Sequence, residues 1–311
     1  MLGINLTRIK VSYHIIIIAF LFIFSACEKD EIFIPDNEPI DNTYISTLQV
    51  ENYINRIFID LIGREPLDAE MTLELANMQN GELSESARRT LIEKLQQDQT
   101  VIPGDSTYKR AYYYRFYDIV KARMIEGVEN DYLAEDRNTM SNSLNGAIAS
   151  GDSAEAAYLR DQIYEINAVF SIPNNYMHDS IGVQEIFYRM IDNYVYDIIN
   201  MNTFNFVNAT FYDLFYRFPT QQEYDISFEM IENNVSGNIV GLGGASRGDY
   251  MEIMTSSSQF YEGLIIWAYQ SLVVREPTAA ELQYHMSYFP NTKDFQELQV
   301  QIMMTNEYAN F

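Results

Sequence analysis

The apolar positions of this chain recur at the spacing of α-helices from about residue 44 onward. Steps of three and four residues place such positions on one face of a helix. No long alternating run predicts a sheet, and the segment that comes closest to one, 205–212, is short. The clearest stripes are Val50, Ile54, Ile57, Phe58, Leu61 and Ile62; Tyr112, Phe116, Ile119 and Val120; and Phe187, Met190, Ile191, Tyr194, Val195 and Ile198.

The pattern predicts an all-α body of about eleven to thirteen helices joined by short connections. Residues 128–170 are more polar and are expected to form a helical hairpin that projects from the body, with breaks at Asn145-Gly146 and at Ser150–Asp152. The glycine-rich segment 241–248 lacks the lysine of a phosphate-binding loop. It is expected to be a mobile linker, with an anion-binding nest as the alternative.

A short motif, Arg-x-Pro-x-x-x-Glu, occurs three times, each time after an apolar helical run. The proline cannot continue the first helix, and the glutamate can complete a capping box at the start of the next one. Thr220 and Thr278 are the expected caps, and Asp68 is the expected cap in the first copy. The motif therefore predicts a helix–corner–helix unit with structural residues Arg64, Pro66 and Glu70; Arg217, Pro219 and Glu223; and Arg275, Pro277 and Glu281.

Each arginine lies at the end of a helix, where a cation complements the negative end of the helix dipole. Asp60 and Asp213 lie four residues before their arginines and are expected to pair with them, whereas Ser271 takes this place in the third copy. The segments 253–260 and 303–308 also resemble each other, and each is expected to close one of two successive repeat units. The body is thus expected to divide into helical modules at 44–98, 203–260 and 261–311, with a central helical region at 99–202.

The runs Ile57–Pro66 and Ala268–Pro277 resemble a bacterial family of short helical modules with the line Leu-Gly-Arg-Glu-Pro. That family is a domain of unknown function in secreted and surface proteins, and it is similar to phycobilisome-linker domains. The likeness covers about 45–98 and 203–311. The middle copy departs from it with Tyr216 and Phe218 in place of the glycine and the glutamate, and the third copy lacks the glycine. The likeness implies a helical, non-enzymatic assembly module and supplies no catalytic residue.

The N-terminus has the features of a signal peptide. Arg8 and Lys10 precede ten apolar residues, 15–24, which are too few to span a membrane. Residues Phe24–Cys27 resemble the lipobox of bacterial lipoproteins, with phenylalanine where leucine is commoner. The resemblance implies removal of residues 1–26 and acylation of Cys27, for example with palmitate.

Residues 27–43 contain two prolines and several acids and are expected to form a flexible tether. Their first cluster, Glu28–Glu31, resembles the surface-export signal of Bacteroidetes lipoproteins, although an ordinary solvated tether is an equal alternative. The expected location is the outer membrane, where the lipid anchors a body that faces the cell exterior. The periplasmic face is the alternative.

The charge balance narrows the range of functions. Forty-four acidic side chains face 20 basic ones, for a net charge of −24. We expect no nucleic-acid partner, because phosphate contacts need clustered lysine and arginine. The chain has a single cysteine, and His178 and His285 do not have the spacing of a metal-binding motif. We therefore expect neither a metal site nor another cofactor.

Aromatic residues are abundant, with 24 tyrosines and 18 phenylalanines. Most should lie in the core, but an exposed patch is expected around 203–216 and around the helix 112–117. The leading expectation is a non-enzymatic subunit of an envelope machine for barrel assembly, secretion, gliding or nutrient uptake. The alternatives are a glycan- or peptide-binding lipoprotein that feeds a transporter, and a hydrolase with an unrecognised carboxylate site.

Overall fold

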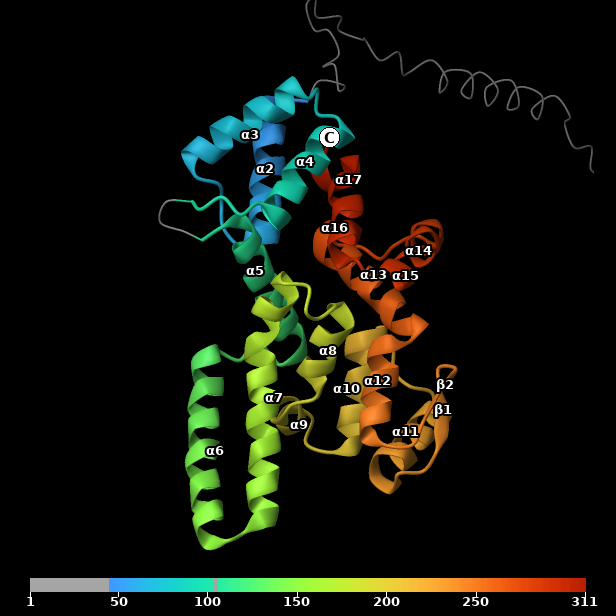
Figure 1. The fold of residues 1–311 in the computed structure, drawn as a ribbon. Coiled ribbons are helices and arrows are strands. Elements are labelled where there is room, and N and C mark those ends of the chain that lie inside the picture. Colours follow the sequence, from blue (N-terminus) through green and yellow to red (C-terminus); the bar gives the residue numbers. More distant parts are fainter. Residues whose placement is uncertain (1–44, 103–105) are drawn as a thin grey trace, which may run out of the picture. The chain divides into compact units, whose positions relative to one another are not determined.

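The computed structural model describes residues 45–102 and 106–311, and Figure 1 shows their arrangement. Residues Ile45–Phe311 form one compact unit. The predicted signal peptide (1–26), Cys27 and the tether (27–43) lie outside the described residues, so lipidation stays a prediction.

The predicted all-α fold is confirmed, and the number of helices is close to the number expected. Some of the additional helices are very short: α15 and α17 have four residues each. The first half contains α2 (Thr47–Ile62), α3 (Asp68–Asn80), α4 (Glu85–Gln97), α5 (Tyr108–Met124), α6 (Asn130–Ser150), α7 (Ser153–Met177), α8 (Val183–Ile191) and α9 (Tyr194–Asn200). The second half contains α10 (Thr203–Phe215), α11 (Gln221–Asn233), β1 (Gly237–Ile239), β2 (Leu242–Gly244), α12 (Arg247–Ser256), α13 (Ser258–Val273), α14 (Ala279–Met286), α15 (Phe289–Thr292), α16 (Phe295–Met303) and α17 (Asn306–Ala309).

Helix α2 illustrates how the local sequence sets these elements. Ser46 caps its first turn, and the side chain of Gln49 accepts the Ser46 N–H at 2.9 Å, which completes a capping box. Gly63 ends the helix in the left-handed conformation, with φ 77°. The predicted stripe from Val50 to Ile62 is buried at every position and forms part of the main core.

The stripe predicted over Phe187–Ile198 is divided between two helices. Asn193 caps α9 with its side-chain oxygen, which accepts two N–H groups of the first turn. Its amide nitrogen donates to two carbonyls at the end of α8. Because the chain changes direction here, Ile198 is 65% exposed and lies outside the core.

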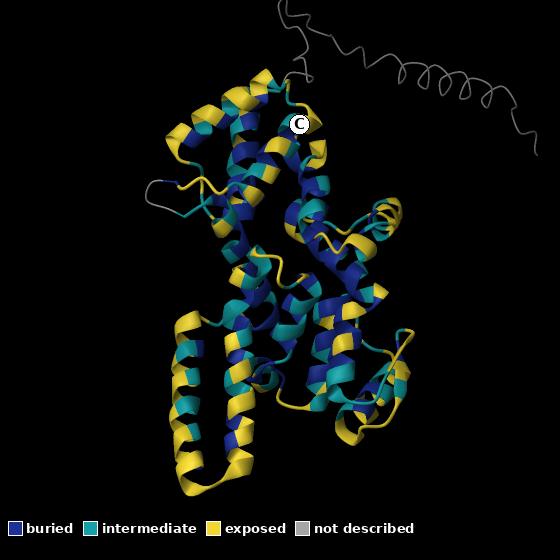
Figure 2. Cartoon of the chain, in the orientation of Figure 1, coloured by how far each residue is buried: buried dark blue, intermediate teal, exposed yellow. Residues whose placement is uncertain are grey.

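Helices α6 and α7 form a helical hairpin in the region where one was expected. Gly151 turns the chain with φ 76°, whereas Asn145-Gly146, the other expected break, lies inside α6. The hairpin has a small apolar cluster of its own, and Figure 2 shows mainly exposed and half-buried residues along α6. The cluster consists of Ala147, Ala156 and Leu159.

The glycine-rich segment is not the expected linker: it contributes the second strand and part of the turn of a β-hairpin and then begins α12. Strands β1 and β2 pair antiparallel, with Ile239 opposite Leu242. Val240 (φ 50°) and Gly241 (φ 87°) occupy the turn, and positive φ at both positions is what a two-residue type I′ turn requires. The expectation missed this because the valine at the first turn position hides the turn signal.

Helix α13 crosses α10 at Gly263. A Cβ atom at this position would lie 1.9 Å from the carbonyl oxygen of Leu214, so glycine alone permits the approach. The segment 205–212, whose alternation came closest to a strand, lies inside α10. The crossing packs the second and third predicted modules against each other.

Helix α17 lies against α2, so the two ends of the compact unit meet. Tyr53 donates to the Met303 carbonyl at 3.2 Å, and Arg56 donates to the Tyr308 carbonyl at 2.9 Å. The Tyr308 hydroxyl donates to the Asp60 carboxylate at 2.7 Å. The first and third predicted modules are therefore joined into one body.

The predicted module boundaries fit this body unevenly. The boundaries at 98/99 and 202/203 fall between helices, but the boundary at 260/261 falls inside α13. None of the helices in the described part of the chain has the length and apolarity needed to cross a bilayer.

Candidate functional site

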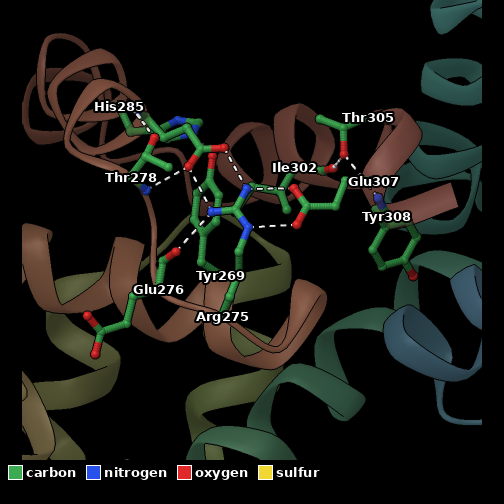
Figure 3. A network of polar contacts seen from close by, with 10 residues as sticks. Tyr269, Arg275, Glu276, Thr278, His285, Ile302, Thr305, Glu307 and Tyr308 are labelled. Atoms are coloured by element: carbon green, nitrogen blue, oxygen red, sulfur yellow. Dashed lines mark hydrogen bonds and ion pairs between the residues drawn. The ribbon is translucent and has the colours of Figure 1, made fainter. Parts of the chain in front are cut away.

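The three Arg-x-Pro-x-x-x-Glu segments have the same structure. In each corner the two terminal nitrogens of the arginine donate to both carboxylate oxygens of the glutamate six residues later, which is the bidentate geometry that arginine favours. Figure 3 shows the third corner, where Arg275 also lies beside Glu307. The N–O distances are 2.7 and 2.9 Å for Arg64–Glu70, 2.9 and 2.6 Å for Arg217–Glu223, and 2.8 and 2.7 Å for Arg275–Glu281.

The same glutamate closes the turn before the second helix. Its carboxylate accepts the cap N–H of Leu67, Thr220 or Thr278, at 2.7, 2.8 and 2.7 Å. Thr220 and Thr278 complete the predicted capping boxes with their hydroxyls. Asp68 is not the cap of the first corner: it is the first residue of α3, because Glu70 fixes the cap three positions before itself.

The prolines of the motif, Pro66, Pro219 and Pro277, all lie in the connections between the two helices of their corners. The residue before each arginine adopts the left-handed conformation, with φ 77° at Gly63, 56° at Tyr216 and 58° at Val274. For residues other than glycine this conformation costs about 1–2 kcal/mol. The departures from the glycine pattern therefore keep the shape of the corner at an energetic cost.

The closing segments add a further partner to two corners. Arg217 donates to the side-chain oxygen of Gln259 at 2.6 Å, and Arg275 donates to Glu307 at 2.5 Å. Both partners belong to the two segments that resemble each other in the sequence. A repeat unit thus consists of a corner and the closing segment that contacts its arginine.

The corners have the chemistry of structural ion pairs. Hydrogen bonds from Arg217 and Arg275 lower the pKa of Glu223 and of Glu281 to about 2. Carboxylates that stay ionised and have both oxygens occupied are poorly suited to proton transfer or to metal binding. We therefore assign the corners a structural role.

The acids one turn before the arginines have a different role from the one expected. Asp60 accepts from the Tyr308 hydroxyl, and Asp213 accepts from the Tyr196 hydroxyl at 3.0 Å, while Arg217 pairs with its capping glutamate. Burial raises the pKa of Asp213 to about 6. These acids connect separate helices instead of neutralising their own corner.

The aromatic helix 112–117 is not a surface patch, so this expectation is wrong. Its rings at positions 112, 113, 116 and 117 are each at most 3% exposed. Helix α5 packs against α2, α4, α7 and α8, which cover the faces that carry these four rings. Phe116 lies 5.1 Å from Phe295 and 6.1 Å from Trp267, between ring centroids.

The segment 203–216 does expose aromatic rings. Phe204, Asn208 and Tyr212 follow one another at steps of four and share one face of α10. Phe204 is 59% and Tyr212 55% exposed, and Phe218 in the following corner is 65% exposed. Phe228 of α11 is 36% exposed.

These rings pack at the surface in two groups. Phe204 lies 5.5 Å from Tyr224, and Tyr224 lies 6.2 Å from Phe228. Tyr212 stacks on Phe218, with 5.5 Å between centroids and an interplanar angle of 25°. We call these five residues the aromatic face.

A recess of about 300 Å³ adjoins Tyr212 and Phe218. At its wall Arg123 donates to the Asp213 carbonyl at 2.5 Å, and its guanidinium carbon lies 4.3 Å from the centre of the Tyr216 ring. The aromatic face therefore borders an arginine that is held by a backbone carbonyl and by an aromatic ring.

Neither His178 nor His285, the two histidines among the residues that the structure describes, belongs to a cluster of metal-ligating side chains. His285 is buried between the hydroxyls of Tyr269 (3.0 Å) and Tyr288 (2.9 Å), and burial lowers its pKa. His178 is exposed at the end of α7. In the described part of the chain, no group of three ligating side chains is placed to hold a metal ion.

Sequence reasoning missed Arg115 and Arg123. Helix α5 directs these side chains to the ends of α2 and α10: Arg115 Cδ lies 3.1 Å from the position of a Cβ on Gly63, and Arg123 stacks on Tyr216. The signal was available as two arginines eight residues apart on a helix otherwise rich in aromatic residues.

Searches with protein-family models, among curated proteins and among solved structures return no match to this chain. The resemblance to the bacterial helical modules therefore remains an expectation that depends on the residues quoted above.

Proposed function

We propose that this protein is a lipid-anchored helical subunit that binds another component of the bacterial cell envelope and has no catalytic role of its own. The observation that carries the proposal is the aromatic face of α10 and α11. Contiguous exposed apolar patches mark interaction sites, and aromatic residues are enriched at interfaces.

The surroundings of the face indicate the character of the partner. Helix α11 exposes Asp225, Glu229 and Glu232 beside the rings and contains no lysine or arginine. Complementary potentials favour and orient association. The partner surface would therefore combine an apolar groove for the rings with basic residues at its rim.

In this proposal Cys27 carries the lipid and anchors the chain in the outer membrane, with the body on the cell exterior. More than one acyl chain gives stable anchoring. The partner would belong to a machine for barrel assembly, secretion, gliding or nutrient uptake. Cys27→Ala should leave an unprocessed precursor without lipid label, and lipid labelling of the variant would contradict this part of the proposal.

The alternative, a glycan- or peptide-binding lipoprotein that feeds a transporter, has a separate observation in its favour. A cavity of about 230 Å³ lies between α2, α5, α13 and α16, and Trp267 and Arg115 line it. Ligand pockets typically measure about 300–1,000 Å³, so this one would accept an end group more readily than a chain.

Site-specific photocrosslinking in living cells tests the docking function. A photoreactive phenylalanine at position 204 or 218 should form a defined adduct with one envelope protein. The same group at Tyr164 of α7, which is 75% exposed, is the matched control and should form none. Equal adducts at all three positions, or none at 204 and 218, would refute the proposed face.

A further inference from the structure

The cavity between α2, α5, α13 and α16 combines an aromatic wall with polar groups. Trp267 stacks on Phe295 with 5.5 Å between ring centroids, and both line the cavity together with Phe116. Ile119, Ala268 and Leu272 complete the apolar wall. The polar lining consists of Asp60, Arg115, Ser271 and Gln299.

Arg115 differs from the other arginine that α5 directs to a helix end. Arg123 donates to the Asp213 carbonyl and stacks on Tyr216. Arg115 Nε is buried, and no described residue offers it an acceptor. Buried polar groups nearly always have a hydrogen-bond partner, so Arg115 is unusual among the arginines of α5. Its Nε packs over Gly63, and the residue also belongs to the lining of the cavity.

The side chain before the corner arginine accounts for the difference. At the end of α10 the ring of Tyr216 covers Arg123, whereas at the end of α2 Gly63 has no side chain to cover Arg115. The guanidinium is held there by the negative end of the α2 dipole and by the charge of Asp60, without a direct hydrogen bond. It remains available on the cavity side.

Gln299 and Ser271, which line the same cavity, also carry hydrogen-bond donors for an anion. The side-chain oxygen of Gln299 accepts from the Tyr112 hydroxyl at 2.6 Å, which leaves its amide N–H groups for the cavity. Ser271 is exposed at the edge of the cavity and stands where the other two corners carry an aspartate. Because this position is a serine and not an aspartate, Asp60 is the one carboxylate among the described residues that line the cavity.

The walls define the chemical class of the anion. Asp60 lines the same cavity, so a divalent anion would be repelled more strongly than a monovalent one. A compact inorganic anion would leave the aromatic wall unfilled. A cavity of about 150 Å³ is enough for a benzene ring, and this one is larger.

We propose that this cavity binds a small aromatic monocarboxylate, with the carboxylate on the guanidinium of Arg115 and the ring against Trp267. The inference is independent of the docking function proposed above. The cavity and the aromatic face share no residue.

Trp267 is the single tryptophan of the chain and lines this cavity, so its fluorescence reports on the surroundings of this one ring. Titration of the full-length protein in detergent with benzoate should change the emission saturably. Benzamide, which has the same ring without the charge, should bind at least tenfold more weakly. Inorganic phosphate at equal concentration should not compete. Absence of a saturable change with benzoate, or competition by phosphate, would overturn the proposal.

Variants separate the cavity from general effects. Arg115→Met keeps an apolar stem without the charge and should weaken benzoate binding at least tenfold. Ser271→Phe lies at an exposed position, should fold normally and should obstruct the cavity with the same loss. Arg110→Met, on the exposed side of the same helix, is the matched control and should bind as the wild type does. Unchanged benzoate affinity in both cavity variants, with normal far-UV circular dichroism, would refute the assignment.

Discussion

Two aromatic regions of this protein look alike in sequence and differ in structure. Helix α5 buries its rings at positions 112, 113, 116 and 117, whereas α10, α11 and the corner between them expose Phe204, Tyr212 and Phe218. Four helices pack around α5. The exposed rings pack in small groups at the surface, and each leaves more than half of its residue accessible to water.

The comparison separates stability from function. A buried ring contributes through the area it removes from water and through its contacts. A solvent-exposed ring contributes little to folding, so the presence of several such rings at neighbouring positions calls for another reason. We take that reason to be a partner, and the following predictions test the contrast.

The largest effect is expected from Phe116→Ala in α5. Phe116 is 3% exposed and contacts the rings of Tyr176, Trp267 and Phe295. Loss of a buried phenylalanine lowers the free energy of unfolding by about 3–5 kcal/mol. Chemical denaturation measures this, and a loss below about 1 kcal/mol would show that α5 is less tightly packed than described.

The next effect is a pH dependence of the folding stability, caused by Asp213 of α10. Burial raises the pKa of Asp213 in the folded protein to about 6, above its ordinary 3.8, so the folded state holds the proton more tightly. This group therefore lowers the stability as the pH rises through that window. Asp213→Asn keeps an acceptor for Tyr196 and lacks this titration.

Denaturation of both proteins at several pH values checks the sign. The stability of the wild type relative to Asp213→Asn should fall between about pH 4 and pH 6 and then level off. If the stability of the wild type relative to Asp213→Asn rose with pH, the folded state would favour the ionised carboxylate. That result would contradict the effect assigned to burial.

A smaller effect of opposite sign is expected at the third corner. Val274 is 83% exposed with φ 58°, so Val274→Gly relieves strain without losing a buried contact. We expect a gain of about 0.5–1 kcal/mol, measured as a rise in the denaturation midpoint. Gly63→Ala, at the same position of the first corner, should lose stability, and a gain there would contradict the shared geometry.

The smallest effect on stability is expected at the aromatic face. Phe204→Ala and Phe218→Ala should each change the free energy of unfolding by less than about 0.5 kcal/mol. Each should nevertheless weaken partner binding, because aromatic hot spots contribute about 2 kcal/mol or more, roughly 30-fold in affinity. Loss of stability comparable to Phe116→Ala would place these rings in the core.

The parts of the fold that depend on neighbouring residues were predictable. The second and third corners follow from a proline, a capping glutamate and a threonine within seven positions, and the stripe of α2 follows from its spacing. The division between α8 and α9 depends on the four hydrogen bonds of Asn193. That signal was present but weaker than the continuous stripe.

The candidate sites depend on tertiary packing and were predictable only in part. An aromatic helix looks the same in sequence whether one neighbour or four surround it, so 203–216 and 112–117 gave the same expectation. Likewise, no local pattern brings Arg115 to the end of α2. The cavity arises from helices that are distant in the sequence, with Asp60 and Gln299 at its two extremes.

The most direct test of the account is native mass spectrometry of complexes from gently solubilised membranes. The wild type should be recovered with a stoichiometric envelope partner. The double variant Phe204→Ser/Phe218→Ser should be recovered alone although it is folded, and Tyr164→Ser should behave as the wild type does. Recovery of the wild type alone, together with turnover in a glycan or peptide screen, would contradict the account and favour an enzyme.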